Sequence, residues 1–380
     1  MNSLEYKFPG LLTESTPSIQ FEIVFFLRPS REFRILNSEF AMHPLQNKKV
    51  LFACMDWGLG HATRSIPLIK KLIAEGNKVT LASNGYAKKF LEEYFPELTV
   101  HSKPGYEISY SAWLPMALVM LQQSASILKT IDEEQKWTQD RLADEKYDVI
   151  FSDNCYGVYS TNIPSYIITH QLMLKTPPLL RFSERILHRI LLKWISNFKG
   201  VMIPDVENEN NLSGDLSHLY PLPQNVEWIG PKSRFSLDEK INPYAEQVEV
   251  FAIVSGPEPQ RTFLEANLEK ILSNIPGHSI IIRGLPGNYE CQKKGNVHLY
   301  NHISDADFRG IIEKSKLIVS RSGYSTIMDL EVLKKKALLI PTPGQTEQEY
   351  LAEYLGNKKH FSFAAQKDLS KNLIEELLRS

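Results

Sequence analysis

The sequence has few cysteines, no long apolar run and almost no net charge, and each absence excludes a class of protein. Its three cysteines, Cys54, Cys155 and Cys291, are scattered without a C-x-x-C spacing, which argues against a disulfide framework or a zinc site and favours a reducing cytoplasm. No apolar run reaches the roughly 18 residues that a membrane span needs. The formal net charge of −1 leaves no basic excess for binding nucleic acid.

The composition that remains is that of a globular α/β protein of about two domains. Of the 380 residues, 43% are hydrophobic, which is enough for two cores. Residues 1–47 show neither clear periodicity nor a glycine motif, and we expect them to be a poorly ordered extension. Residues 48–230 and 231–380 both read as alternating strands and helices, which predicts two doubly wound, Rossmann-like domains that face each other across a cleft.

The stretch 316–350 predicts a complete βαβ unit. An apolar strand (317–320) leads through a tight turn into a helix (325–333), and a second strand (337–341) leads into a polar loop. Strand carboxyl ends and helix amino ends converge there, and free N–H groups and the helix dipole favour an anion such as phosphate. The candidate phosphate contacts are Ser322, Gly323, Ser325 and Thr326.

Polar residues further along this unit could bind the rest of a nucleotide-sugar. Asp329, one turn into the helix, could accept hydrogen bonds from a ribose diol. Further hydroxyls could be bound by the polar residues after the second strand, Gln345, Glu347, Gln348 and Glu349. The alternative interpretation is a helix capped by Ser322 or Ser325, with the other residues as solvated surface.

A glycine-containing loop also follows the first predicted strand (50–55). It contains Gly58, Gly60 and His61 and would face a ligand at the carboxyl edge of the sheet. The dinucleotide fingerprint GxGxxG is absent because residue 63 is threonine, so a dehydrogenase loses support. His61 is either a helix-start histidine bonded to a backbone carbonyl or a general base at the cleft.

Two more strand ends of the first half deliver polar side chains to the same edge. Asp153 follows the strand 147–152, and His170 follows the strand 165–169. Either could deprotonate an acceptor hydroxyl. The alternative for Asp153 is a cap, and for His170 a polar residue of a loop.

The second half offers further candidates after its first strand (248–254). Gly256, next to Ser255, would let the backbone bend under a phosphate, and Arg261 would supply a cation for a diphosphate leaving group. The residues Asp305-Ala306-Asp307 formally match the Asp-x-Asp metal motif. They open a helix, however, and we expect Asp305 to cap that helix rather than to bind a metal.

The motifs GLGHATRS (58–65) and 317–350 resemble those of GT-B glycosyltransferases, and most closely the group of the peptidoglycan lipid-intermediate N-acetylglucosaminyltransferase. The loop of His61 also resembles that of nucleotide-sugar hydrolases of sialic-acid-like biosynthesis. The resemblance implies that His61 lies beside the reacting carbon of the donor. It further implies that Ser322 and Gly323 hold the diphosphate of the donor and that Asp329 holds the ribose. Gln348 and Glu349 would hold the sugar, and the nucleobase would lie near Ile303.

The resemblance implies a metal-independent transferase without a cofactor. It would move a sugar from a nucleotide-sugar donor, UDP-linked, to a hydroxyl of a saccharide or lipid-linked acceptor in cell-envelope glycan or glycolipid synthesis. Two alternatives stay open: a nucleotide-sugar hydrolase in which Asp153 or His61 activates water, and a non-catalytic nucleotide-sugar binding protein. The segment Leu179–Lys199 predicts a basic amphipathic helix, which either packs into the protein or makes peripheral contact with the inner face of the plasma membrane.

Overall fold

Two seven-stranded sheets organise the computed structural model, which describes residues 45–106, 116–235, 241–256, 258–285, 289–356, 358 and 360–380. Both sheets lie within the unit Phe40–Ser380. The extension expected at residues 1–47 lies almost wholly outside the described residues.

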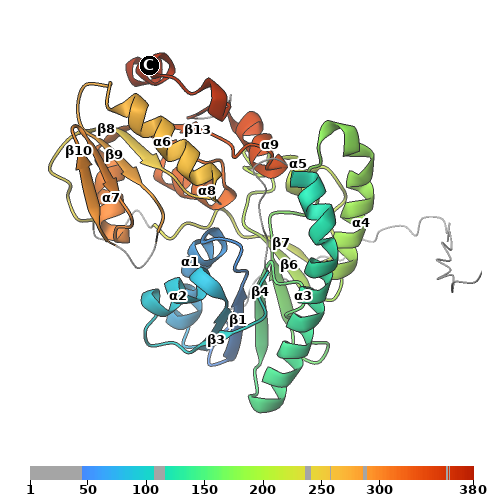
Figure 1. Cartoon of the computed structure of the whole chain (residues 1–380). Helices are drawn as coiled ribbons and strands as arrows, with labels where there is room; N and C mark the ends of the chain where they lie inside the picture. Colours follow the sequence, from blue (N-terminus) through green and yellow to red (C-terminus); the bar gives the residue numbers. More distant parts are fainter. Residues whose placement is uncertain are drawn as a thin grey trace, which may run out of the picture. The chain divides into compact units, whose positions relative to one another are not determined.

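The first sheet is parallel throughout, with the strand order β3-β2-β1-β4-β5-β6-β7 (Figure 1). Its strands are β1 (Lys49–Cys54), β2 (Lys78–Ser83), β3 (Val100–Ser102), β4 (Val149–Asp153), β5 (Ser165–Ile168), β6 (Gly200–Ile203) and β7 (Val226–Trp228). The helices between them are α1 (Gly60–Ala74), α2 (Gly85–Tyr94), α3 (Met116–Asp144), the 3-10 helix η1 (Pro178–Ser183), α4 (Glu184–Ile195) and α5 (Asp215–His218).

The second sheet has the strand order β10-β11-β9-β8-β12-β13-β14. Its strands are β8 (Val248–Ile253), β9 (Ser279–Ile282), β10 (Cys291–Lys294), β11 (Val297–Tyr300), β12 (Ser315–Ser320), β13 (Ala337–Leu339) and β14 (Phe361–Phe363). Its helices are α6 (Gln260–Leu272), α7 (Asp305–Lys314), α8 (Tyr324–Leu333), α9 (Thr346–Leu355), the 3-10 helix η2 (Gln366–Asp368) and α10 (Lys371–Arg379). Only the edge strand β10 runs antiparallel to its neighbour.

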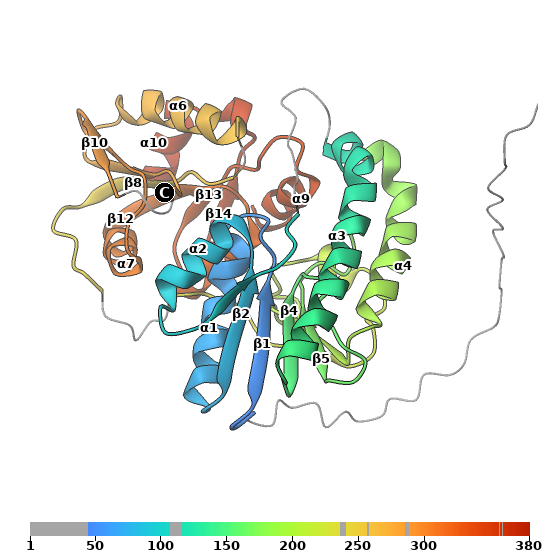
Figure 2. The same ribbon diagram turned by 60° about the horizontal axis from the view of Figure 1, so that its bottom comes forward.

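Helices cover both faces of each sheet, because the central strands are apolar on both sides. In β1, Val50 and Phe52 pack toward α1 and α2, whereas Leu51 and Ala53 pack toward α3. Figure 2 shows α1 and α2 on one side of the first sheet and α3 and α4 on the other. In the second sheet, the core shared with α6 and α10 is separate from the core shared with α7, α8 and α9. The two doubly wound domains expected from the sequence are confirmed.

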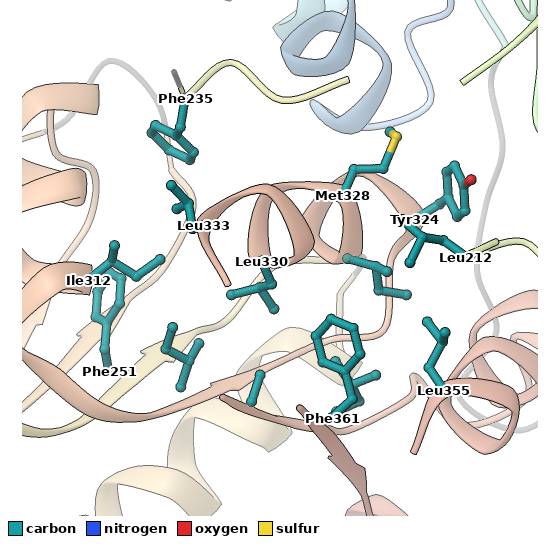
Figure 3. Close-up of a cluster of buried hydrophobic side chains, with 14 of the residues drawn as sticks. Leu212, Phe235, Phe251, Ile312, Tyr324, Met328, Leu330, Leu333, Leu355 and Phe361 are labelled. Atoms are coloured by element: carbon teal, nitrogen blue, oxygen red, sulfur yellow. The ribbon is translucent and has the colours of Figure 1, made fainter. Parts of the chain in front are cut away.

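Helix α8 is buried on more than one side (Figure 3). Leu330 and Leu333 belong to the core of the second sheet, together with Phe251 and Phe361. Tyr324 and Met328 lie on another side of the helix, and Met328 Sδ accepts a hydrogen bond from the backbone N–H of Lys232. Packing from several directions fixes the helix start, where the sequence predicts a phosphate site.

One local expectation is wrong: Asp305 does not cap α7. The cap is Ser304, whose extended backbone lets its side chain turn back and accept a hydrogen bond from Asp307 N–H. Asp305 is already the first helical residue and pairs with Arg234 at 3.2 Å. The segment Leu179–Lys199 is also not one helix, because η1 precedes α4.

The strand order reverses once in each sheet, and each reversal creates a crevice at the carboxyl ends of two strands. In the first sheet this switch point lies between β1 and β4, where Cys54 pairs with Asp153. In the second it lies between β8 and β12, where Ile253 pairs with Ser320. Doubly wound proteins bind their ligands at such crevices.

Candidate functional site

The first switch point holds His61 and Asp153, two of the residues that the sequence nominates. Asp153 is the last residue of β4 and is fully buried. His61 lies in the first turn of α1, and its Nδ1 is 2.7 Å from Asp153 Oδ1. The glycine loop after β1 and the end of β4 therefore bring together residues that are 92 positions apart in the chain.

Arg64, one turn further along α1, is bound to the same carboxylate. Its Nε donates to Asp153 Oδ2 at 2.7 Å, and its Nη2 donates to Oδ1. Ser65 Oγ donates to Oδ2 as well, at 3.1 Å. Burial would raise the pKa of Asp153, but the charge of Arg64 and the hydrogen bonds outweigh it and hold this pKa well below its usual range. Asp153 is therefore ionised.

The ionised partner fixes the tautomer of His61. A carboxylate can only accept, so Nδ1 of His61 must carry the proton, and the lone pair is on Nε2. Burial and the charge of Arg64 lower the pKa of His61, against the opposing effect of Asp153. His61 is thus neutral at pH 7, with one nitrogen able to accept a proton.

His170 has both ring nitrogens engaged. Arg64 Nη1 lies 3.0 Å from its Nδ1, and because a guanidinium can only donate, Nδ1 must accept. The proton is then on Nε2, which donates to Glu347 Oε1 at 2.9 Å. The ring also stacks in parallel on Tyr324, with the ring centres 3.9 Å apart. Of the two histidines that the sequence nominates, only His61 keeps a lone pair outside this network.

The second switch point is lined mainly by backbone. Helix α8 begins after Gly323 without a side-chain cap, so its first N–H groups are not bonded by a capping side chain. A Cβ at Gly323 would meet no atom within 4 Å, so the space beside this helix start is open. Gly256, with Ser255 in the loop after β8, has a φ of +113°, a conformation that favours glycine.

A buried arginine, Arg321, lies immediately before this helix start. It is 2% exposed and within the described residues it donates only to backbone carbonyls, those of Ile340, Pro341 and Gln260. Its Nε has no partner among the described residues. Burial lowers the pKa of Arg321 to about 10, so it remains a cation near the open helix start.

Three of the nominated side chains hold this edge together. Ser322 is fully buried, and its Oγ donates to the backbone oxygen of Gln348 at 2.8 Å. Gln348 Oε1 accepts from Thr342 N–H at 2.9 Å, and Glu349 Oε1 accepts from Gly344 N–H at 2.8 Å. These contacts tie the start of α8 to the loop between β13 and α9.

Four further candidates also belong to the second domain. Asp329 accepts a hydrogen bond from Ser233, and burial raises its pKa to about 6. Arg261 pairs with Glu258 and Glu265, so its charge is already balanced. Ile303 packs at the margin of the core, and Thr326 is half-buried in the first turn of α8.

Direct contacts join the two switch points. Ser325 Oγ, in the first turn of α8, donates to the backbone oxygen of Gly60 at 2.8 Å. Tyr324 Oη donates to the carbonyl of Pro204 at 3.1 Å. Glu347 of α9 bonds His170 and also accepts from Gln171. The residue before His61 therefore touches the helix start at which an anion would bind.

Comparison with known proteins bears on the fold and the class of this chain. Residues 287–380 match the glycosyltransferase family 28 C-terminal domain. An uncharacterized glycosyltransferase of Methanosarcina acetivorans is 23% identical over 377 aligned residues, covering 87% of this chain and 88% of that protein. The solved structure of the kitacinnamycin glycotransferase covers 88% of this chain and 92% of its own, with a TM-score of 0.60 and 14% sequence identity.

A second relative bears on the resemblance read from the motifs. The UDP-N-acetylglucosamine N-acetylmuramyl-(pentapeptide) pyrophosphoryl-undecaprenol N-acetylglucosamine transferase of Prochlorococcus marinus is 24% identical over 162 residues, which is 39% of this chain and 46% of that protein. The resemblance is confirmed: the fold is that of the GT-B enzymes, and the chain is a glycosyltransferase.

Sequence reasoning ranked several residues of this site too low. Arg64 of the GLGHATRS motif is only a weaker candidate in the sequence, for a contact with phosphate or acceptor, and Glu347 is one of several polar residues after the second strand. Arg321 was passed over although it stands between a buried strand and a glycine turn, where an unpaired arginine is unusual. No group of His, Cys, Asp and Glu in the described part of the chain could hold a metal ion.

Proposed function

We propose that the chain transfers a sugar from a UDP-linked donor to an acceptor hydroxyl, with His61 as the general base. The observation that carries this proposal is the hydrogen bond from Ser325 Oγ to the Gly60 oxygen. It joins the residue before the base to the first turn of the helix at which the leaving diphosphate would bind. Base and leaving group would thus flank one reacting carbon, as transfer by direct displacement requires.

The donor would lie along the second switch point. Its diphosphate would accept hydrogen bonds from the free N–H groups at the start of α8 and from the loop of Ser255 and Gly256. Arg321 would supply positive charge, since its guanidinium is buried without a carboxylate partner in the described residues. Asp329 would exchange its bond with Ser233 for the ribose diol. Gln348 and Glu349 would lie beside the sugar.

The chemical step needs one proton acceptor and one leaving group. The lone pair of His61 Nε2 would take the proton of the acceptor hydroxyl while the hydroxyl oxygen attacks the anomeric carbon. The bond between that carbon and the β-phosphate oxygen breaks, and its electron pair leaves with the nucleoside diphosphate. Asp153 would stabilise the imidazolium that forms. A single displacement of this kind inverts the anomeric configuration.

Backbone N–H groups and Arg321 would replace a metal ion at the diphosphate. Two carboxylates of this domain that could serve as metal ligands have protein partners, Glu349 with Gly344 N–H and Asp329 with Ser233. We therefore expect turnover to be unchanged, within about twofold, when EDTA is added. A loss of turnover that added Mg²⁺ or Mn²⁺ restores would contradict this part of the proposal.

A thermal-shift panel with UDP, GDP, CMP and dTDP tests the donor. A nucleotide at a hundredfold excess over its dissociation constant adds about 2.7 kcal/mol of stability, which is readily detected. We expect the largest shift with UDP and a smaller one with Asp329→Ala. A selective shift by another nucleotide would correct the donor, and no shift with any of them would reject the site.

Product analysis separates transfer from hydrolysis. UDP-sugars would be incubated with and without saccharide or lipid-linked acceptors, and UDP, free sugar and glycosylated product would be quantified. We expect UDP release to depend on an acceptor. Stoichiometric free sugar without an acceptor would instead identify a hydrolase in which His61 activates water, and binding without turnover would identify a sensor.

The outer face of η1 and α4 supports an acceptor that is presented at a membrane. Its exposed apolar side chains are Leu179, Phe182, Ile186 and Ile190, with exposures of 87%, 76%, 54% and 41%. The exposed cations between them are Arg181, Arg185, Arg189 and Lys193. The only acid of this segment, Glu184, is buried and bonded to Thr176. Such a face suits an anionic lipid surface.

We therefore propose peripheral binding at the cytoplasmic face of the membrane, where envelope glycans and glycolipids are assembled on lipid carriers. No helix within the described residues is long and apolar enough to span a bilayer. Co-sedimentation with phosphatidylglycerol vesicles tests the proposal, with phosphatidylcholine vesicles for comparison. Phe182→Ser should weaken binding to the anionic vesicles about tenfold, whereas Phe263→Ser, at a similarly exposed phenylalanine of α6, should not. Equal loss in both variants would contradict a specific surface.

A further inference from the structure

We propose that Arg64 is a positioning residue that keeps His61 in its neutral, proton-accepting state and fixes which nitrogen accepts. The consequence for catalysis rests on the proposed function, but the state of His61 itself does not. Arg64 reaches no described anion other than Asp153 by hydrogen bond, and it is only 3% exposed. Its role is therefore inside the site rather than at its surface.

The charges bonded to Asp153 affect the protonation of His61. A histidine beside a lone buried carboxylate would gain a proton readily, because the imidazolium would neutralise the buried charge. Here the fork of Arg64 already neutralises Asp153 through two hydrogen bonds. Protonation of His61 would then leave a net positive charge on the group formed by His61, Arg64 and Asp153, which is unfavourable because Arg64 and Asp153 are buried. These three side chains therefore favour neutral His61, and the attraction of Glu347 is weaker because its side chain is 34% exposed to water.

Other charged groups also face His61 and change its pKa. Glu347, from α9, attracts a proton to His61, and so does Asp153, from β4. Arg64, from α1, opposes them. His170, from the loop after β5, lies between Arg64 and Glu347 and accepts from the one while it donates to the other. Arg64 is thus the single cation in a cluster with two carboxylates and two histidines.

The contacts of Asp153 also determine which ring nitrogen of His61 accepts a proton. Arg64 Nε and Ser65 Oγ both donate hydrogen bonds to Asp153 Oδ2. Oδ1 is shared between Arg64 Nη2 and His61 Nδ1. Because the carboxylate cannot rotate without breaking the fork, it holds the His61 ring with Nδ1 inward. The lone pair of Nε2 is then the one left for a substrate.

A purely structural role would be different in a measurable way. If Arg64 served only to join α1 to β4 and His170, its loss would lower stability and leave the titration of any folded His61 where it was. If our inference is right, removing the charge moves the titration of His61 upward. Lysine at this position keeps the charge but not the fork, so it separates the two effects.

The test is a titration of the histidine ring by NMR, in protein labelled at the histidine Cε1, without any substrate. The His61 resonance would be assigned with His61→Asn. In the wild type we expect His61 to titrate below its ordinary value of about 6.5. In Arg64→Gln and Arg64→Met we expect the midpoint to rise by about 1 to 3 pH units. In Arg64→Lys it should stay within about 0.5 unit of the wild type.

Two further variants keep the test decisive. Arg309→Gln removes another buried arginine, which pairs with Glu313 on α7, and should leave the His61 midpoint unchanged. If both neutral variants fail to fold, Asp153→Asn replaces them: with the carboxylate gone, the charge of Arg64 is unopposed, and His61 should titrate lower than in the wild type. An unchanged midpoint in folded Arg64→Gln or Arg64→Met, or in Asp153→Asn, would overturn the inference.

The pH dependence of turnover links this inference to the proposed function. With donor and acceptor in hand, the acidic limb of kcat/KM against pH, which reports the free enzyme, should move upward in Arg64→Met by the same amount as the NMR midpoint, and Arg64→Lys should restore its position. A shifted NMR midpoint with an unshifted acidic limb would leave the inference standing and remove His61 as the base. An unshifted NMR midpoint would refute the inference whatever the kinetics show.

Discussion

The two switch points have the same strand geometry but opposite chemistry. At the first, four ionisable side chains, His61, Arg64, Asp153 and His170, are bonded to one another and largely buried. At the second, the space beside Gly323 is open, and its lining is backbone N–H and one buried arginine. The first is suited to hold a lone pair in place, and the second to bind an anion.

This difference agrees with what each half of the proposed reaction demands. Proton transfer needs one nitrogen of known protonation state in a fixed direction, which only a bonded network provides. A diphosphate needs several N–H donors and room, and any extra side chain would compete with it for both. The duplicated fold therefore carries two sites that cannot exchange roles. Substitutions should separate them: at the first switch point they should lower kcat, and at the second they should weaken nucleotide affinity.

The largest expected effect is that of His61→Asn. Asparagine can still donate to Asp153, so the fold and the donor site should survive, but the proton acceptor is lost. We expect kcat to fall about 10²- to 10⁴-fold, while donor KM changes by less than about threefold. Steady-state kinetics of purified protein would measure both.

His188→Asn serves as the matched control, because His188 is a buried helical histidine whose ring donates to a backbone carbonyl, that of Leu172. That was the alternative interpretation of His61 itself. The control should lower the melting temperature without lowering kcat by more than about twofold. Equal kcat losses in both variants would make His61 a structural residue too.

Gly323→Ala and Gly323→Val should give the reverse pattern. The φ of Gly323 is −70°, and no atom lies within 4 Å of an added Cβ, so alanine fits the protein without ligand at a cost of about 1 kcal/mol for the lost preference at this cap. Valine adds two methyl groups on the same open side. Each would, however, occupy space that the diphosphate needs. Calorimetry should show UDP affinity falling about tenfold for alanine and further for valine.

A comparison glycine sharpens this experiment. Gly214 has a φ of +52°, and an added Cβ would approach Tyr350 Oη to 2.3 Å, so Gly214→Ala should destabilise the fold. Its melting temperature should drop clearly, while any folded fraction should bind UDP normally. If instead the Gly323 variants bind UDP as the wild type does, the diphosphate lies elsewhere.

The sequence could predict the strands, the helices and the edges at which function lies, because apolar periodicity and glycine turns are local properties. It brought His61, Asp153 and His170 to one edge correctly. It could not predict that Arg64 would bind both Asp153 and His170, because those contacts span 89 and 106 positions and depend on how α1 packs. For the same reason it left His170 open as either a base or a polar residue of a loop.

The polar residues of the second edge were harder still. Ser322 looks like a phosphate ligand in the sequence, but its hydroxyl donates to Gln348. Arg261 looks like a free cation, but it is paired with Glu258 and Glu265. Whether a side chain points toward a ligand or toward a neighbouring loop is decided by packing between distant segments, which local spacing does not encode.

Asp329→Asn should stabilise the protein at neutral pH. Burial raises the pKa of Asp329 to about 6, from 3.8, so the folded state binds a proton more tightly than the unfolded state does. The stability that this carboxyl contributes is complete below about pH 4 and is lost as pH rises through about 6. At pH 7.5 we expect the asparagine variant to be more stable by about 1 to 2 kcal/mol, with no difference at pH 4.

Denaturant unfolding at both pH values checks this expectation, with Asp132→Asn as the control because Asp132 is exposed and pairs only with Lys136 of its own helix. The same Asp329 variant should bind UDP more weakly, since an amide accepts from the ribose diol less strongly than a carboxylate does. Weaker UDP binding together with higher stability would show that Asp329 contributes to ligand binding at a cost in the stability of the fold. A variant that is destabilised at pH 7.5 would show that its bond with Ser233 matters more than its burial.

The smallest expected effect is that of Glu347→Gln, which tests the contact between the two switch points. Burial raises the pKa of Glu347, but the hydrogen bond that His170 donates and the other nearby groups outweigh it and leave that pKa lowered. Its contribution to stability is therefore present above the unfolded pKa of about 4.5 and is lost as pH falls below that value.

Because the Glu347 side chain is 34% exposed, we expect a loss of only about 0.5 kcal/mol at pH 7, measured by denaturant unfolding and absent at pH 3.5. The double variant with His170→Asn should cost less than the sum of the single variants, since the two side chains share one hydrogen bond. Additive losses would mean that Glu347 and His170 act independently. The hydrogen bonds around His61 at the first switch point would then not depend on Glu347 of the second domain. The two switch points would be independent in stability as well as different in chemistry.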